Sequence, residues 1–482
     1  MKRLAVFALF LLLAVSLSVA ETPVERFGQL AVDGNRLVSK ETGKPVQLRG
    51  MSFFWSMAGG GEGCGHYNAN VVNTLADDWK VNVIRAAMGV DENWGTSSLG
   101  YRVGNKACGT TNDSLVKRVV NAAIDRGIYA IIDYHSHNAH TYPDTAKKFF
   151  QEMASKYKGV PNVLYEIYNE PTAAGANSWK NSVKPYAEKI IAAIREIDPN
   201  NVIIVGTPLY CQDVDIATAN PIEGNNIIYT LHFYSATHKD TLRIKARTAL
   251  NTNKKALFVS EFGVSNAQAN PPLDTAEATK WLNFLDSNMV SWVNWSISDK
   301  DKNDKGVAEI TSAIVKGGGT NGGWTTDKLT TSGNYIRNKL IAAQQREEEE
   351  WATATLAAER AVPKTQQTGG SAAIAPVGAA SGSFSAGPVP ASKAASGIKF
   401  FWQGKAVKGG SLLIYDVLGN RVKSVGISDV SGGGISKRTV GSWDLTDSKG
   451  RRVAAGSYLL KGKIAASDGN VAHISSIIVI SD

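Results

Sequence analysis

Hydrophobic and polar residues follow two alternating patterns along residues 24–343. Short apolar runs rich in Val, Ile and aromatic residues indicate buried β-strands, and longer segments with apolar residues every three or four positions indicate amphipathic helices. The predicted strands are residues 46–53, 81–88, 129–135, 163–170, 201–207, 227–234, 256–263 and 290–297. The predicted helices are residues 68–79, 113–127, 144–159, 178–198 and 273–287. Eight strands that alternate with helices over about 300 residues predict an α/β fold, the (β/α)8 TIM barrel.

The sequence around these elements completes the prediction. Residues 28–39, GQLAVDGNRLVS, predict a hairpin with Asp33–Gly34 as its turn. The helix after the fifth strand is the weakest of the pattern, and a helix over residues 332–343 closes the barrel. A doubly wound open sheet is the alternative fold, but no Gly-rich phosphate-binding turn follows the first strand.

The first 20 residues have the pattern of a secretory signal peptide. Lys2 and Arg3 precede an apolar run, which ends at the small residues Ser18–Val19–Ala20. No other stretch approaches the roughly 20 apolar residues that a membrane-spanning helix needs. We therefore expect an exported protein without a transmembrane segment, either secreted or held at a bacterial cell surface.

The C-terminal part of the chain differs in composition from the barrel region. A chain of 482 residues is long for one compact core and suggests two domains. Residues 344–361 predict a charged, solvated helix, and residues 363–397 consist largely of Pro, Ala, Gly, Ser and Thr, which predicts a linker. Residues 398–482 contain short alternating strands broken by Gly, Asn and Asp, which predict a small all-β sandwich.

Charge and cysteine content narrow the class of protein. The formal net charge is +9, but residues 397–482 alone hold 12 Lys and Arg against 6 Asp and Glu, and the rest of the chain is nearly balanced. Because the chain has no nucleic-acid motif, a basic surface for solubility or envelope contact is favoured over a nucleic-acid partner. Cys64 and Cys108 lie in Gly-rich loops and are the better disulfide pair, whereas Cys211 is expected to be buried. Their spacing offers no zinc-binding pattern.

Two of the predicted strands end in a carboxylate. Residues 163–171, VLYEIYNEP, lead to Glu170, and residues 256–263, ALFVSEFG, lead to Glu261. Charges avoid buried sites unless something there uses them, and the C-terminal ends of barrel strands are where active sites form. Two such carboxylates are what acid/base and nucleophilic chemistry on a glycosidic bond requires. The structural alternative is that each Glu only pairs with an Arg at the rim of the barrel.

Six more polar or aromatic residues end the predicted strands: Arg85, His135, Asn169, His232, Tyr234 and Trp295. Arg85 and the Tyr234 hydroxyl can keep a nucleophile ionised, while burial and neighbouring negative charge favour a protonated acid. Asn169 can hydrogen-bond a sugar hydroxyl, and the face of Trp295 can stack on a pyranose ring. Each also has a structural explanation: an Arg can cap the barrel mouth, a buried His can bind backbone carbonyls, and aromatic side chains can pack at the rim.

These residues stand in motifs that resemble glycoside hydrolase family 5, especially its bacterial endoglucanases (cellulases). The motifs are VNVIRAAM around Arg85, IIDYH ending at His135, IYNEP around Glu170, HFY at 232–234, SEFG around Glu261 and NWSISDKD at 294–301. The resemblance covers about residues 24–342 and implies endo-hydrolysis of β-1,4-glucan with retention of configuration. It implies Glu170 as acid/base, Glu261 as nucleophile, a sugar subsite formed by the six residues above and a sugar-binding Lys300, with neither a cofactor nor a metal.

The resemblance leaves the more distant sugar subsites and the tail open. Many family members carry a His in the loop after the first strand, where this chain has Phe54 and Trp55. Residues 398–482 resemble the small immunoglobulin-like modules that end many exported bacterial proteins, through IYDVLGNRV and WDLTDSKGRRVAAGSYLLK. That resemblance implies a sorting signal for outer-membrane secretion or surface attachment. A cellulose-binding module and a plain spacer are alternatives, although Tyr415 and Tyr458 are expected in the core of the module.

Two other functions and several substrates are alternatives. A metal-dependent hydrolase would use His135, His137 and His140 with His232, but such barrels place their His-x-His on the first strand and an Asp at the end of a late one. A non-catalytic carbohydrate-binding barrel would lack one of the two Glu residues. Mixed-linkage glucan, xylan and mannan are alternatives to cellulose, because loops set the walls of the sugar subsites. We expect a monomer whose partner is a β-glucan polysaccharide.

Overall fold

Two compact units make up the described chain. The computed structural model describes residues 21–361, except 92, 95–96 and 303–305, and most of residues 398–481 together with short strands between 373 and 392. One unit comprises Glu21–Leu356, and the other lies within Ala357–Asp482. The predicted signal peptide at residues 1–20 lies outside the described residues. No helix in the described part of the chain is long and apolar enough to cross a membrane.

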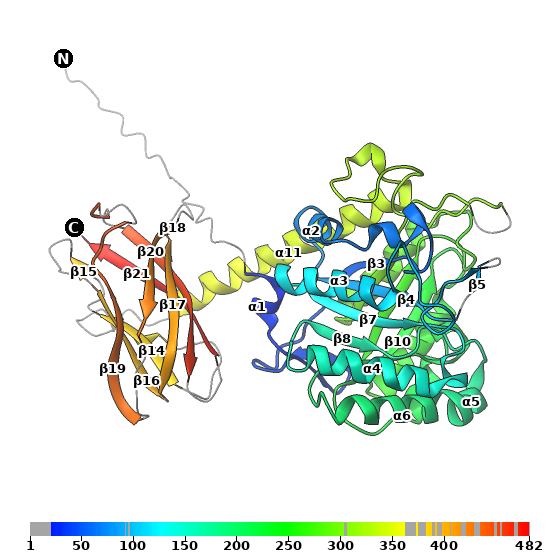
Figure 1. The fold of residues 1–482 in the computed structure, drawn as a ribbon, viewed down its shortest axis with the longest axis horizontal. Coiled ribbons are helices and arrows are strands. Elements are labelled where there is room, and N and C mark those ends of the chain that lie inside the picture. The colour runs from blue at the N-terminus through cyan, green and yellow to red at the C-terminus, as the bar shows by residue number, and fades with distance from the viewer. Residues whose placement is uncertain are drawn as a thin grey trace, which may run out of the picture. The chain divides into compact units, whose positions relative to one another are not determined.

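Eight parallel strands form a closed barrel in the first unit (Figure 1). They are β3 (Arg49–Phe53), β4 (Val83–Gly89), β7 (Tyr129–His135), β8 (Val163–Glu166), β9 (Ile203–Val205), β10 (Ile227–Tyr234), β11 (Leu257–Gly263) and β12 (Ser291–Ile297). Each pairs with the next in the chain, and β12 pairs with β3 to close the ring. The predicted (β/α)8 barrel is confirmed, and the open-sheet alternative is wrong. Strand β8 ends four residues earlier than predicted, so that Asn169 and Glu170 lie on the loop after it.

Helices follow the strands and cover the outside of the barrel, as α4 and α6 do in Figure 1. The α-helices are α1 (Pro23–Phe27), α2 (Ala69–Asp77), α3 (Asn112–Arg126), α4 (Pro143–Tyr157), α5 (Gly175–Ser178), α6 (Lys184–Arg195), α7 (Pro208–Cys211), α8 (Val214–Ala219), α9 (Asp240–Arg247), α10 (Thr275–Ser287) and α11 (Thr331–Ala361). Short 3₁₀ or π-helical turns are η1 (Gly60–Glu62), η2 (Cys64–His66), η3 (Ala139–Thr141), η4 (Trp179–Val183), η5 (Thr248–Thr252) and η6 (Thr326–Lys328). The helices predicted over 332–343 and 344–361 form the single helix α11, because no Gly or Pro follows Gly333 to break it.

The N-terminal end of the barrel is filled with apolar side chains. Side chains alternate between the inside and the outside of the barrel along each strand, and Val83, Ile131 and Leu164 belong to one buried cluster inside it. The hairpin of β1 (Leu30–Asp33) and β2 (Arg36–Ser39) adds apolar side chains to this cluster and so closes that end of the barrel. Its connecting residues are 34–35, one position later than predicted, because Asp33 still pairs with Arg36. The opposite end of the barrel is thereby left for polar side chains.

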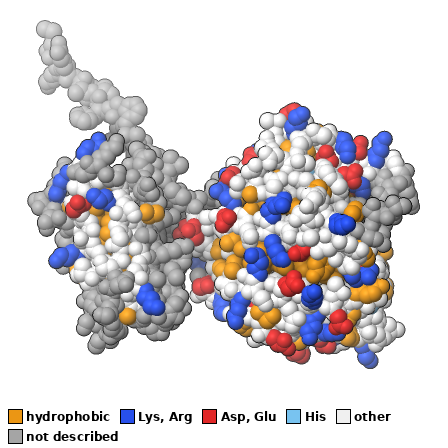
Figure 2. Space-filling model, in the orientation of Figure 1, with side chains coloured by type: hydrophobic (Ala, Val, Ile, Leu, Met, Phe, Trp, Pro, Cys, Tyr) orange, Lys and Arg blue, Asp and Glu red, His pale blue; other side chains and the backbone are white. Residues whose placement is uncertain are grey.

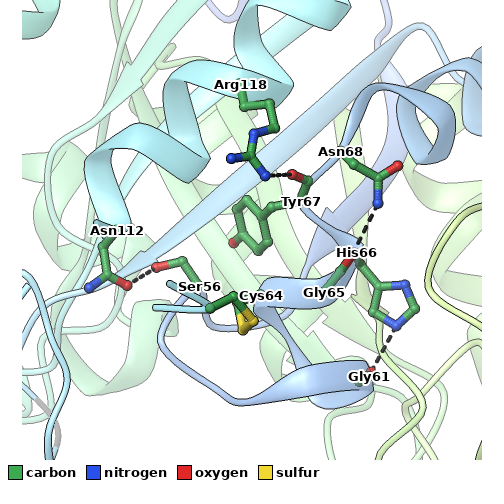
Figure 3. Close-up of a disulfide and its surroundings, with 10 residues drawn as sticks. Ser56, Gly61, Cys64, Gly65, His66, Tyr67, Asn68, Asn112 and Arg118 are labelled. Carbon is green, nitrogen blue, oxygen red and sulfur yellow. Dashed lines mark hydrogen bonds between the residues drawn. A yellow bond between two sulfur atoms is a disulfide. The ribbon is translucent and has the colours of Figure 1, made fainter. Parts of the chain in front are cut away.

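A disulfide fixes the loop that follows β3 (Figure 3). Cys64 and Cys108 are bonded, as predicted, and link this loop to the segment before α3. The Tyr67 hydroxyl lies 2.8 Å from the carbonyl oxygens of Phe54 and Ala87, which holds the same loop against β4. The loop that carries Phe54 is therefore anchored at several points beside the barrel mouth. The third cysteine, Cys211, is buried and unpaired, also as predicted. A two-stranded hairpin of β5 (Asn93–Trp94) and β6 (Ser97–Ser98) lies in the loop after β4.

The second unit consists of two small sheets. Their strands are β13 (Ala373–Ile374), β14 (Gly382–Gly387), β15 (Ala391–Ser392), β16 (Ile398–Gly404), β17 (Val407–Tyr415), β18 (Arg421–Ile427), β19 (Gly434–Trp443), β20 (Gly456–Ala466) and β21 (Val471–Ser481). The strand orders are β13-β14-β16-β19 and β15-β21-β20-β17-β18. Side chains from both sheets form one buried cluster, which includes Phe400, Trp402 and Tyr458. The expected core position of Tyr458 is confirmed, and the side chain of Tyr415 lies outside what the structure describes.

Part of the predicted linker is sheet. Strands β13, β14 and β15 fall within residues 363–397, and β14 pairs with β16 along its whole length. The sequence predicted β14, GSFSAG, as part of the linker. This strand has no apolar alternation to mark it and is defined by its backbone hydrogen bonds. On the face of the barrel unit drawn in Figure 2, Lys and Arg are interspersed with Asp and Glu, in line with its nearly balanced charge.

Candidate active site

Polar side chains gather where the barrel strands end. On β4 the inward position after Val83 is Arg85, and on β8 the one after Leu164 is Glu166. On β7 Ile131 is likewise followed by Asp133. Because inward-facing residues are two apart, a polar layer lies directly on the apolar one at the C-terminal ends of the strands.

Strand β11 has one residue more than its neighbours at the level of this polar layer. Thr230 of β10 pairs with Phe258, yet His232 pairs with Glu261, and the same step occurs between β11 and β12. Such an extra residue is a β-bulge, which re-aims the side chains that follow it. As a result Ser260 and Glu261 both reach groups inside the barrel, although strict alternation would have turned one of them outward.

Both oxygens of the Glu261 carboxylate accept hydrogen bonds. Arg85 Nη1 donates to Oε2 over 3.0 Å, and Tyr234 Oη donates to Oε1 over 2.7 Å. Burial raises the pKa of Tyr234, so its hydroxyl keeps the proton that it donates. The structure thus brings together the nucleophile candidate and the two groups that the sequence assigned to it.

Arg85 is fully buried and contacts three carboxylates. Besides Glu261, its Nε and Nη2 atoms donate to the two oxygens of Glu166 over 2.7 and 3.2 Å. Nη2 also lies 3.0 Å from Asp133 Oδ2 and donates to Asn169 Oδ1 over 2.6 Å. Burial raises the pKa of Asp133 to about 7, although the charge of Arg85 opposes this, and burial raises the pKa of Glu166 as well. One guanidinium therefore faces more carboxylates than it can neutralise.

Glu170 is bound by two histidines. His232 Nδ1 lies 2.8 Å from Oε1, and His137 Nε2 lies 3.2 Å from Oε2. Burial favours the protonated carboxyl, as the sequence predicted, but the hydrogen bonds to His137 and His232 outweigh it and lower the pKa of Glu170. The sequence-based expectation of a protonated acid counted burial and negative charge, but not the two imidazole rings that oppose them.

His232 has a pKa that is shifted in the opposite direction to that of Glu170. Burial lowers its pKa, but the hydrogen bond to Glu170 and the charge of Glu261 raise it by more. Its Nε2 atom lies 3.0 Å from Ser260 Oγ, which itself donates to Glu166 Oε1 over 2.6 Å. The two ring nitrogens of His232 are thus both hydrogen-bonded, one to Glu170 and the other to Ser260. Through this chain and Arg85, the two candidate catalytic carboxylates are connected.

Aromatic rings form one side of the site. The ring of His135 is nearly parallel to that of Trp295, with 5.1 Å between centroids, and nearly perpendicular to that of Trp55, with 4.1 Å between centroids. Asp133 Oδ2 accepts the hydrogen bond from His135 Nδ1 over 2.6 Å, which fixes the orientation of this ring. Phe54 packs against Trp295 at 5.2 Å. The two residues that stand where the resemblance expected a His thus form the wall beside the predicted sugar-stacking Trp.

Lys300 lies on the loop after β12 and contacts this wall at Phe54. Its Nζ atom lies 3.3 Å from Glu309 Oε2 and 5.3 Å from the centre of the Phe54 ring. Burial raises the pKa of Glu309, and the charge of Lys300 opposes that shift. The predicted sugar-binding lysine is therefore held by a carboxylate and an aromatic ring.

The histidines of the YHSHNAH segment do not converge on one point. His135 bonds to Asp133, His137 to Glu170, and His140 Nδ1 lies 2.7 Å from the Tyr168 hydroxyl. Among the described residues, one group of acidic and His side chains has atoms close enough to share an ion, and it consists of Glu170, His232 and Glu261, with the atoms within 4.8 Å of one another. The ligand set of the metal-dependent alternative is thus not assembled, since His135 and His140 have other partners.

Sequence reasoning missed several residues that shape this site. Asp133, Glu166 and Ser260 received no role, although a charge two positions before a candidate His, or within an apolar strand, marks a polar layer. His137 was considered only as a metal ligand. Its position beside Glu170 depends on the path of a loop, which no periodic pattern predicts.

The fold and the site together define a retaining glycoside hydrolase. Carboxyl groups about 5 Å apart suit a covalent glycosyl-enzyme intermediate, whereas inverting enzymes need about 6.5–9.5 Å for an intervening water. Here an oxygen of Glu170 and one of Glu261 lie within 4.8 Å, at the C-terminal face of a (β/α)8 barrel.

Comparison with known proteins supports this class of enzyme. Residues 39–301 match the family model for cellulase (glycosyl hydrolase family 5), and the chain belongs to this family. An endoglucanase of Clostridium saccharobutylicum is 43% identical over 344 residues, which are 70% of each chain. Endoglucanase Z of Dickeya dadantii is 49% identical over 273 residues, 57% of this chain and 60% of that one. A solved structure from Cytophaga hutchinsonii is 44% identical and covers 68% of this chain and 100% of its own, with a TM-score of 0.62.

Proposed function

We propose that the protein is an endo-β-1,4-glucanase (cellulase) in which Glu261 is the nucleophile and Glu170 the acid/base. The observation that carries this proposal is the difference between the two carboxylates. Glu261 is held by Arg85 and Tyr234, neither of which takes up or releases a proton near neutral pH. Glu170 is held by two histidines, the type of side chain whose ordinary pKa lies nearest to neutral pH. The first environment suits a permanent anion, and the second suits a group that gains and loses a proton in each cycle.

In the first step an oxygen of Glu261 attacks the anomeric carbon of the sugar. The bond from that carbon to the glycosidic oxygen breaks, its electron pair stays on the oxygen, and the proton of Glu170 moves to it. Because the hydrogen bonds of the free site lower the pKa of Glu170, the carboxyl takes up this proton from solvent as the sugar binds, on the oxygen that faces the glycosidic oxygen. Exclusion of water by the sugar removes the solvation that favours the charged carboxylate, which makes this uptake easier.

In the second step Glu170 takes a proton from a water molecule. The water oxygen attacks the anomeric carbon, the ester bond to Glu261 breaks, and its electron pair returns to the carboxylate. Two inversions give net retention. Glu261 ends as a carboxylate, and Glu170 ends with a proton that it releases to solvent when the product leaves.

The surrounding groups suit a glucose ring. The Asn169 Oδ1 atom accepts a hydrogen bond from Arg85, while the buried Nδ2 atom has no hydrogen-bond partner among the described residues. An unpaired buried donor is costly, so a sugar hydroxyl is the natural partner for it. Trp295 provides the apolar face, with the ring of His135 nearly parallel to it, and Lys300 lies over Phe54, which packs against Trp295. We propose that His135, His232 and Lys300 bind the sugar. β-1,4-Glucan is favoured as the substrate because the matched relatives are endoglucanases.

We also propose that the enzyme acts outside the cytoplasm as a monomer, and that residues 398–482 form an immunoglobulin-like sorting module. The signal-like residues 1–20 support export. The aromatic side chains Phe400, Trp402, Trp443 and Tyr458 lie inside the module, which argues against the flat aromatic row of a cellulose-binding surface.

The test compares substrates and follows the product's configuration. Rates on carboxymethylcellulose, mixed-linkage glucan, xylan and mannan are measured side by side, with the highest rate expected on a β-1,4-glucan. Proton NMR of fresh product should show the β-anomer first. A preference for xylan or mannan would overturn the substrate, and an α-anomer formed first would overturn the double displacement.

A further inference from the structure

The two oxygens of Glu170 have different surroundings. Oε1 faces His232, whose side chain is 2% exposed and whose second ring nitrogen is also hydrogen-bonded, to Ser260. Oε2 faces His137, whose side chain is 30% exposed and whose contact is longer, 3.2 against 2.8 Å. The Oε1 contact is thus part of a buried chain, while the Oε2 contact lies on the open side of the site.

The loop that carries His137 is tied to the loop after β8, which carries Glu170. The Tyr168 hydroxyl donates to the His137 carbonyl over 3.0 Å, and the His137 ring lies 5.6 Å from the ring of Trp55. Ser136, next to His137, is bonded to Asp91. These contacts hold the imidazole in front of Oε2.

An acid whose two oxygens are both engaged cannot reach a leaving group until one contact opens. The Oε1 contact is buried, whereas the Oε2 contact lies on the open side, so Oε2 is the oxygen that meets the substrate and carries the proton to be donated. On the proposed function, we infer that His137 is a positioning residue for the acid/base: it holds Oε2 in the free enzyme and releases that oxygen to the glycosidic oxygen when glucan binds.

On this proposal His137 affects the acidity of Glu170 in the free enzyme but not in the complex with glucan. In the free enzyme the hydrogen bonds to His137 and His232, which work against burial, lower the pKa of Glu170. Other titratable groups around Glu170 are Tyr234, His238, Asp133, Glu261 and Cys211. Loss of the His137 ring leaves all of these in place and raises the pKa of Glu170. The acid must be protonated to react, so the alkaline limb of the pH profile moves to higher pH.

The experiment measures kcat and kcat/KM for cellopentaose against pH in His137→Leu, His137→Gln and His140→Gln. The limbs of the kcat/KM profile give the pKa values of the essential groups in the free enzyme, and those of the kcat profile give their values in the complex. For His137→Leu we expect the alkaline limb of kcat/KM to rise by about one pH unit, with a much smaller change in kcat. His137→Gln keeps an N–H donor and should restore most of the wild-type profile. His140→Gln removes a ring from the same loop that does not touch Glu170, and it should leave the limb unchanged.

A second readout does not depend on turnover. In a Glu261→Gln background, ¹³C NMR of labelled Glu side chains gives the titration of Glu170, assigned by its loss in Glu170→Gln. His137→Leu should move this titration to higher pH by a similar amount. A folded His137→Leu protein with unchanged titration and unchanged kcat/KM limb overturns the inference. Failure of the wild type to cleave β-glucan would overturn the proposed function instead, and the NMR titration would still decide the role of His137.

Discussion

Replacing Arg85 with Lys tests the assignment of the nucleophile most directly. The guanidinium donates to Glu166 through Nε and Nη2. Its Nη2 atom also donates to Asn169, and its Nη1 atom donates to Glu261. A lysine amine is a single point and cannot span these partners, although it keeps the charge.

The size of the effect follows from the hydrogen bonds that a lysine cannot make. If the amine remains at Glu166, Glu261 is deprived of one charge-assisted hydrogen bond of about 1.5–3 kcal/mol, which corresponds to about a 10- to 150-fold fall in kcat/KM. A lysine amine also replaces the two-atom contact with Glu166 by a single one. Because Glu166 and Asp133 stay buried, this loss should lower the free energy of unfolding by about 2–5 kcal/mol.

The assay combines kcat/KM on soluble glucan with thermal unfolding. Tyr234→Phe is the matched control: it removes the other hydrogen bond to Glu261 but no buried ion pair, so activity should fall with little loss of stability. An Arg85→Lys enzyme with nearly wild-type kcat/KM and melting temperature would refute the idea that this fork holds the nucleophile.

Four further outcomes are expected. Glu261→Gln should abolish turnover of every substrate, whereas Glu170→Gln should keep activity on aryl glycosides with good leaving groups; equal losses on such substrates would contradict the roles. Burial raises the pKa of Asp133 from its ordinary value of about 4 to about 7, so its stabilising contribution is full below about pH 4 and is lost as pH rises to about 7. Melting temperatures should show wild type losing stability relative to Asp133→Asn across this range, and a constant difference would count against this. Replacing both Cys64 and Cys108 by Ser should cost up to about 4 kcal/mol in urea unfolding, from the 44-residue separation of the pair. A chain ending near Val362 should keep full activity on soluble glucan and bind insoluble cellulose as the whole chain does, and a large loss of binding would make the tail a cellulose-binding module.

The sequence alone determined the barrel and most of its mouth. Strands and helices differ in hydrophobic period, so eight strands were visible without any knowledge of their neighbours. Since parallel strands in a barrel all end on one face, the residues at those ends were bound to meet, and Arg85, Tyr234 and Glu261 do so.

Only the tertiary structure decided how those residues are charged and aimed. The bulge in β11 exists because of pairing with β10 and β12, and it alone lets Ser260 and Glu261 both face inward. The ionisation of Glu170 depends on two histidines brought from β10 and from a loop. Alternation gives the side of a strand on which a residue lies, but hydrogen-bond partners come from other strands and loops, and their distances are set only when the barrel closes.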